Sequence, residues 1–185
     1  GSALEIMEEG ILEGLNIVDK KISRGQMFIP EFLMAAKAAK RGIKILKPHI
    51  TQNRMIDKKT AIVGTVKGDF HSASKAIMAL MCEWSGLNII DIGVDVSCEQ
   101  FFEHAKKHNA DLICILAFQS EISPVTTTEI QKVAAFTKQN KMSQNVKVLI
   151  ASQAISKKYS QEIGAHVYAP NAFSAFKKAQ GLFSQ

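Results

Sequence analysis

The chain has few of the features that mark membrane, secreted or disordered proteins. Its 185 residues include only 11 glycines and 4 prolines, so a long low-complexity linker is not expected. No run approaches the ~18–20 consecutive apolar residues that a membrane-spanning helix needs. No segment resembles a secretory leader. We therefore expect a globular protein of one or two domains without a membrane partner.

Cysteine is also scarce. The three cysteines are Cys82, Cys98 and Cys114, which are widely spaced and form no C-x-x-C pair. An odd number of separated thiols argues against a disulfide framework and against a zinc site. We expect reduced thiols in a cytoplasmic protein.

The charge balance is basic, with 23 Lys and Arg against 17 Asp and Glu. A basic excess can indicate a nucleic-acid partner when the charges gather on one face. Here the lysine pairs are scattered along the chain: Lys20-Lys21, Lys58-Lys59, Lys106-Lys107, Lys157-Lys158 and Lys177-Lys178. This dispersion is typical of a solvated surface, so no nucleic-acid partner is expected.

Residues 4–50 have the period of amphipathic helices. The apolar residues of the first predicted helix recur at three-to-four spacing: Leu4, Met7, Ile11, Leu15 and Val18. A second helix is predicted from Glu31 to about Lys47, with Pro30 at its start. Its predicted apolar face contains Phe32, Leu33, Ala36, Ala39, Ile43 and Leu46. Two such helices cannot close a core alone, so this segment must pack on something else.

The pattern changes after a polar stretch at 51–59, which predicts a linker. Five apolar strands are predicted: Thr60–Val66, Asn88–Gly93, Asp111–Ala117, Val146–Ala151 and His166–Tyr168. Helices are predicted between and after them: Ser72–Ser85, Cys98–His108, Val125–Gln139, Lys157–Ile163 and Asn171–Phe183. This alternation predicts that residues 60–185 form an α/β, flavodoxin-like (Rossmann-like) domain with a five-stranded parallel sheet. Such folds bind ligands beyond the carboxyl ends of the strands.

The loop after the first predicted strand holds the strongest candidate site. It contains Asp69-Phe70-His71, and it has neither a dinucleotide-binding nor a Walker pattern. A carboxylate two residues before a histidine can accept the Nδ1 proton and leave Nε2 free for a metal. A helix-capping aspartate beside a surface histidine is the simpler alternative.

The stretch Gly64-Thr65-Val66-Lys67-Gly68-Asp69-Phe70-His71 resembles the start of the cobalamin-binding module of corrinoid proteins, whose signature is D-x-H-x-x-G, then S-x-L, then G-G. Those proteins carry methyl groups in methylamine, methanol and methoxy methyltransferase systems, and methionine synthase has the same module. Residues 24–36, residues 45–48 and Gly164–Ala172 resemble other parts of the family. The family's helical cap has four helices, so residues 4–50 resemble a truncated cap.

The resemblance implies that His71 is the lower ligand of cobalt, in base-off/His-on mode, and that Asp69 tunes its basicity. It also implies a slot for the cofactor's nucleotide tail. The implied cofactor-binding positions are Asp69, His71, Ser74, Leu116, Phe118, Ala151, Ser152 and Tyr168. The chain departs from the family at several of them. The motif glycine is Ser74, the S-x-L residues are Leu116-Ala117-Phe118, and the G-G pair is Ala151-Ser152. Bulkier residues at a packed slot cost ~1–3 kcal/mol each.

Three functions follow from this resemblance. The first is a cobalamin- or corrinoid-binding methyl carrier of one-carbon metabolism, a non-catalytic subunit that serves a substrate-specific methyltransferase and a second methyltransferase. The second is a diverged paralogue that no longer binds full cobalamin and acts as an interaction or regulatory module. The third is a corrinoid-dependent sensor. A truncated cap would also expose an apolar face and allow a homo-oligomer.

Overall fold

A computed structural model describes residues 2–49, 59–84, 87–118, 123–139 and 146–183. Of the predicted linker at 51–59, all but Lys59 lies outside these ranges, so the domain boundary stays a prediction. Among the described residues, no helix is both long enough and apolar enough to cross a membrane.

The centre of the molecule is a five-stranded parallel sheet in the order β2-β1-β3-β4-β5. Its strands are β1 (Thr60–Thr65), β2 (Asn88–Asp91), β3 (Leu112–Ala117), β4 (Lys147–Ser152) and β5 (Val167–Ala169). Strands β1 and β3 are buried along their whole length, because helices cover both faces of the sheet. The predicted fold class is confirmed, and each predicted strand begins and ends within two residues of an observed one.

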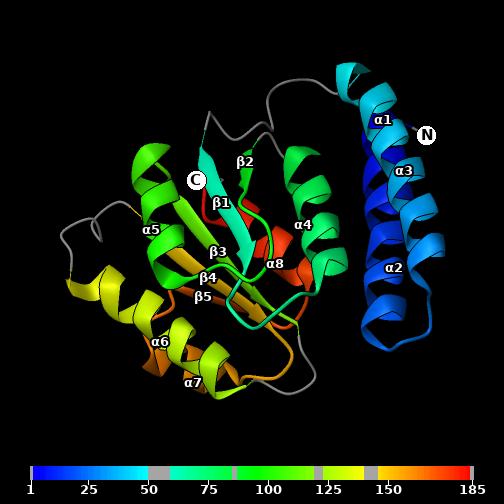
Figure 1. Cartoon of the computed structure of the whole chain (residues 1–185). Coiled ribbons are helices and arrows are strands. Elements are labelled where there is room, and N and C mark those ends of the chain that lie inside the picture. Colours follow the sequence, from blue (N-terminus) through cyan, green and yellow to red (C-terminus); the bar gives the residue numbers. More distant parts are fainter. Residues whose placement is uncertain (1, 50–58, 85–86, 119–122, 140–145, 184–185) are drawn as a thin grey trace.

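Two layers of helices cover the sheet (Figure 1). On one face lie α4 (Ser72–Trp84) and α8 (Ala172–Gly181), and on the other lie α5 (Cys98–Lys107), α6 (Pro124–Gln139) and α7 (Lys157–Glu162). Local signals start several of them. Ser97 accepts a hydrogen bond from the Gln100 amide at 3.4 Å and begins α5. Asn171 caps α8 through the Ser174 amide at 2.7 Å.

The N-terminal segment, residues 3–49, is called the cap below. It contains α1 (Ala3–Glu5), the π-helical η1 (Ile6–Leu12), α2 (Glu13–Ser23), α3 (Ile29–Leu46) and the 3-10 turn η2 (Lys47–His49). The cap packs on the outer side of α4 and α8, and its buried side chains belong to the same hydrophobic cluster as that face of the sheet. The cap therefore meets the expectation that it packs on something else.

Two details of the cap differ from the sequence-based expectation. The turns at Ile6–Leu12 are π-helical rather than α-helical, a difference that the spacing of apolar residues does not predict. Leu33, which was predicted to face the core, is 58% exposed, whereas Phe32 and Ile43 are buried. Phe32 and Ile43 are eleven residues, or about three turns, apart and share one face of α3, and Leu33 lies about 100° away from that face.

The cysteines behave as predicted. Cys82, Cys98 and Cys114 are all free and buried. Burial raises the pKa of the Cys82 and Cys98 thiols to about 12. The described thiols are therefore neutral core residues rather than nucleophiles.

Candidate functional site

The loop between β1 and α4 is held in one conformation by its surroundings. Gly68 has a φ of +88°, and a Cβ atom there would lie 2.8 Å from the Thr126 hydroxyl oxygen. The Gly68 amide donates to the Asp95 carboxylate at 2.7 Å, and Thr126 donates to the Lys67 carbonyl at 3.1 Å. A glycine is needed here both for the backbone conformation and for the close approach of Thr126.

Asp69 and His71 form the pair that the sequence predicts. The Asp69 carboxylate is fully buried, while the His71 side chain is 59% exposed. Asp69 Oδ1 lies 2.7 Å from His71 Nδ1 and 2.8 Å from the His71 amide nitrogen. These two contacts of Asp69 Oδ1, one with the backbone and one with the ring, fix both the position and the orientation of the imidazole. No hydrogen bond among the described residues uses Nε2, so that nitrogen remains available to a ligand.

The buried carboxylate has a third donor from a distant part of the chain. The Phe118 amide, just after β3, donates to Asp69 Oδ2 at 2.6 Å. The backbone of Asp69 is also fixed, because the Thr65 hydroxyl donates to its carbonyl at 2.6 Å. Three N–H donors converge on the carboxylate, which compensates the cost of burying it.

A cavity of about 290 Å³ lies beside the imidazole, between the cap and the β1–α4 loop. The cap supplies three of its apolar walls: Ile22, Met27 and Ile29. The core supplies the remaining walls: Phe70, His71, Ser72, Ala73, Ser74 and Phe118. The site therefore has one exposed, oriented imidazole next to a mostly apolar surface that two parts of the chain build together.

Ser74 lines this cavity and also connects the cap to the core. Its side chain hydrogen-bonds to Asp19 of α2, which is only 2% exposed. Asp19 also accepts from the backbone amide of Ala172 at the start of α8, at 3.2 Å. Burial raises the pKa of Asp19 despite these hydrogen bonds.

The other predicted positions separate into two groups. Leu116 and Ala151 are paired across β3 and β4, are fully buried, and belong to the cluster that faces α4 and α8. Ser152 is also fully buried, but side chains alternate along a strand, so it faces the opposite side of the sheet. Tyr168 lies on that opposite side too, because its partner Ile150 belongs to the other cluster.

Tyr168 closes the end of β4 on its own side. Its hydroxyl lies 3.0 Å from both the Ser152 and the Ile155 carbonyl oxygens. Burial raises the pKa of this phenol, so it is a donor at neutral pH. Of the eight predicted positions, four lie around the cavity: Asp69, His71, Ser74 and Phe118.

Sequence reasoning missed the residues that support this site. Thr65 is a fully buried polar residue within a strand, and Asp95 adopts a left-handed φ of 57°. A buried threonine in an apolar strand is a weak signal, because threonine is common in strands. The cap residues of the cavity were not predicted to line it, since that role depends on how the cap packs.

A metal at this site would need to bring most of its own ligands. Within the described ranges, no group of three or more His, Cys, Asp or Glu side chains could hold a metal ion. A single oriented imidazole beside an apolar cavity instead suits a metal that a flat, largely apolar ring already coordinates. The fold is Rossmann-like, and the site places one oriented imidazole beside a mostly apolar cavity.

The comparisons with known proteins identify the class to which the chain belongs. A family model described as B12 binding domain matches residues 59–177, and a second with the same description matches residues 1–47. The dimethylamine corrinoid protein 1 of Methanosarcina acetivorans is 35% identical over 181 residues, covering 97% of this chain and 83% of the relative. The dimethylamine corrinoid protein of Methanosarcina barkeri is 37% identical, with the same coverage.

Solved structures agree on the fold. The monomethylamine corrinoid protein of Methanosarcina barkeri matches with a TM-score of 0.60 at 27% identity, over 98% of this chain and 84% of that one. A cobalamin-binding protein from Desulfitobacterium hafniense shares the fold with a TM-score of 0.71 at 22% identity, over 97% and 82%. The chain belongs to the corrinoid-protein family of B12-binding domains, and its cofactor class is a corrinoid.

Proposed function

We propose that this chain is the methyl-carrying corrinoid subunit of a cobalamin-dependent methyltransferase system, with His71 as the protein ligand of cobalt. It would serve a substrate-specific methyltransferase and a second methyltransferase. The two relatives described above carry dimethylamine in their names, so methylated amines are the substrate class that we favour. The three buried thiols suit a reducing, cytoplasm-like compartment.

The observation that carries this proposal is the Asp69–His71 pair. Asp69 occupies Nδ1 of the imidazole at 2.7 Å, which leaves Nε2 as the free nitrogen. A ligating histidine that donates its other ring N–H to a carboxylate becomes more basic and is fixed in orientation. The alternative of a helix-capping aspartate explains the amide contacts of Asp69 but not its contact with Nδ1.

The remaining residues of the cavity would position the macrocycle. When bound, the corrinoid supplies a cobalt centre that accepts and releases a methyl group. Phe70 and Phe118 of the core, and Ile22, Met27 and Ile29 of the cap, line the cavity with apolar surface. Such walls favour a ring and exclude water from its surroundings. Phe70 is 67% exposed, an unusual exposure for a phenylalanine that contact with a ligand would reduce.

A test of the ligand assignment is electron paramagnetic resonance of the cobalt(II) form after reconstitution with a cobalamin. The wild-type spectrum should show nitrogen coupling from a protein imidazole, and labelling the histidines with ¹⁵N should change that coupling. His71→Ala should abolish the labelling effect, because no other described histidine lines the cavity.

The matched control is His108→Ala. His108 is the C-cap residue of α5, on the other side of the sheet, and its ring stacks on that of His104 with a centroid distance of 6.0 Å. This variant should keep the wild-type spectrum. If His71→Ala also keeps it, then His71 is only a loop residue and the ligand assignment is wrong.

One observation favours part of the second function named in the sequence analysis, namely a weakened affinity for full cobalamin. Leu116 and Ala151 fill the face of the sheet beneath α8, where the family's tail slot is implied, and both are fully buried. We infer that a corrinoid without a bulky lower base, such as cobinamide, binds at least as well as cobalamin. The site needs only the cavity and His71 for such a ligand.

A further inference from the structure

A buried lysine lies at the start of α4, beside the proposed cofactor site but not in its cavity wall. Lys75 is in the first turn of α4, four residues after His71, and its side chain is only 8% exposed. Of the lysine and arginine side chains that the structure describes, this is the only buried one. Its ammonium group contacts both carboxylate oxygens of Asp91, the last residue of β2.

This position is unfavourable for a cation for two reasons. Burial removes the hydration of the ammonium group, and a carboxylate partner offsets only part of that cost. The positive end of the helix dipole also lies in the first turn of α4, where it repels a positive charge. An apolar side chain would avoid both costs, and replacing a buried ion pair by apolar residues is often neutral or stabilising. Stability alone therefore does not explain Lys75, whereas a requirement for one fixed geometry does.

Asp91 also leads, through hydrogen bonds, to the carboxylate that holds the imidazole. It accepts a hydrogen bond from the Gly93 amide at 2.9 Å. The Gly93 carbonyl accepts from the Thr65 amide at 3.2 Å, and the Thr65 hydroxyl donates to the Asp69 carbonyl at 2.6 Å. The buried lysine and the imidazole are therefore connected twice, once through these hydrogen bonds and once through the first turn of α4.

The first half of the β1–α4 loop is fixed in a different way. Val66 and Val96 form a parallel bridge between this loop and the β2–α5 loop. The Asp95 amide donates to the Asp69 carbonyl at 3.1 Å. This half is thus held by its backbone, which many side chains would permit. The first turn of α4 is held to the last residue of β2 by one particular side chain, that of Lys75.

We propose that Lys75 is a positioning residue of the cofactor site. Its pairing with Asp91 fixes the first turn of α4, and this keeps the His71 imidazole in the orientation in which Nδ1 meets Asp69. The proposal rests on the proposed function for the role of His71 as a ligand. The positioning itself is a property of the chain without a cofactor.

The position of the imidazole proton reports this positioning in the cofactor-free chain. At about pH 9, above the range in which histidines ordinarily titrate, long-range ¹H–¹⁵N NMR distinguishes a proton on Nδ1 from one on Nε2. The wild-type His71, whose signal is identified by its loss in His71→Ala, should have its proton on Nδ1, because Asp69 Oδ1 lies 2.7 Å away. Lys75→Met removes the ammonium group and keeps a long side chain. It should lower the ratio of Nδ1-protonated to Nε2-protonated His71, the tautomer ratio, at least threefold.

The matched control is Lys59→Met. Lys59 also pairs with an aspartate, Asp111, at 2.8 Å, but it lies just before β1, at the opposite end of that strand. Its loss should leave the tautomer ratio unchanged. Asp91→Asn is a second variant of the proposed pair, and it changes the more exposed partner, whose side chain is 42% exposed. It should lower the tautomer ratio in the same direction as Lys75→Met.

Reconstitution with a cobalamin separates this proposal from the proposed function. The share of the cobalt(II) spectrum with imidazole nitrogen coupling should fall at least twofold in Lys75→Met and stay unchanged in Lys59→Met. A wild type without that coupling contradicts the ligand role of His71, and the tautomer ratio then decides the positioning proposal by itself. An unchanged tautomer ratio in both Lys75→Met and Asp91→Asn overturns the proposal. An equal fall in Lys59→Met overturns it as well, because the effect would then be a general loss of stability.

Discussion

The strongest test of the tail-slot interpretation is to empty the slot. Leu116 and Ala151 are partners across β3 and β4 and are fully buried against the α4–α8 layer. The double variant Leu116→Ser/Ala151→Gly removes four carbon atoms from this interior and adds one hydroxyl. If the slot lies here, the variant should bind cobalamin at least tenfold more tightly than the wild type, a gain of about 1.4 kcal/mol. Its affinity for cobinamide should not change.

The same substitution has a calculable cost in the absence of a cofactor. At ~0.8 kcal/mol per buried carbon, the transfer free energy lost is about 3 kcal/mol. A buried hydroxyl without a partner adds ~1–3 kcal/mol. The apo variant should therefore unfold at a lower temperature than the wild type. Cobalamin should raise the melting temperature of the variant by more than cobinamide does, since only cobalamin has a tail to fill the space.

The other face of the same two strands offers a matched control. Ile115 and Ile150 are also cross-strand partners and fully buried, but they belong to the cluster beneath α5 and α6. Ile115→Ser/Ile150→Val again removes four carbons and adds one hydroxyl, so it should cost similar stability and gain no affinity for cobalamin. Two observations would refute the reasoning: a control that gains as much as the slot variant, or a wild type that already binds cobalamin far more tightly than cobinamide.

The remaining predictions concern the buried polar groups and the core. Asp69→Asn should destabilise the fold by about 2–3 kcal/mol in urea titration, because an amide cannot accept from three N–H donors as the carboxylate does, and an unchanged unfolding midpoint would contradict this. Burial raises the pKa of Asp19, so the native state holds this proton at a pH where the unfolded state has released it, and stability falls as pH rises from about 4 through the folded pKa. Asp19→Asn should remove this loss of stability with rising pH. The free energy of unfolding of the variant relative to the wild type should therefore rise between about pH 4 and pH 7. Profiles of stability against pH that run parallel for the two proteins would contradict this prediction. Gly64→Ala should cost ~1–3 kcal/mol in thermal unfolding, because its Cβ atom would lie 2.9 Å from Ile92 Cγ1, and a neutral effect would mean that Ile92 moves freely. The three buried thiols should react with a thiol reagent only at the rate of unfolding, and fast labelling in native buffer would contradict their burial.

The sequence by itself determined the layout of the α/β domain and the centre of its site. The five strands are short apolar runs between turn residues, and burial on both faces leaves such runs few alternatives. The Asp69–His71 pair could also be predicted, because a carboxylate two residues before a histidine can contact both its amide and its ring nitrogen. Patterns of this kind depend on residues that are close together in the sequence, so they can be predicted without the tertiary structure.

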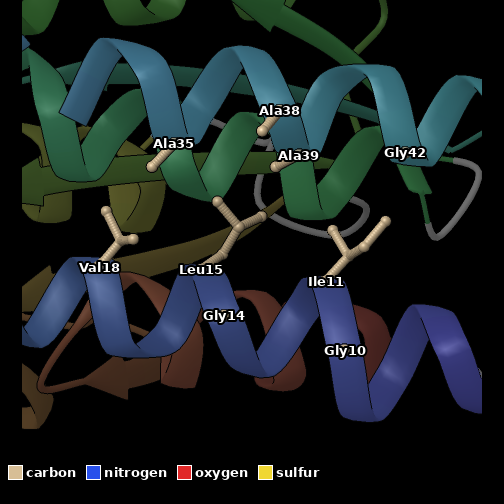
Figure 2. Close-up of a pocket in the computed structure, with 9 residues that line it drawn as sticks. All are labelled: Gly10, Ile11, Gly14, Leu15, Val18, Ala35, Ala38, Ala39 and Gly42. Carbon is tan, nitrogen blue, oxygen red and sulfur yellow. The ribbon is translucent and has the colours of Figure 1, made fainter. Parts of the chain in front are cut away.

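The tertiary structure decided everything that joins distant segments. The Phe118 amide that completes the Asp69 site is 49 residues away in sequence, and the Ala172 amide that binds Asp19 is 153 residues away. The predicted tail-slot residues separated into two groups because side chains alternate along β4, which places Ser152 on the opposite face from Ala151. The groove between the two long helical segments of the cap (Figure 2) depends on the level at which these antiparallel helices meet. That level is set by the packing of Ile11 against Gly42, and no local pattern encodes it.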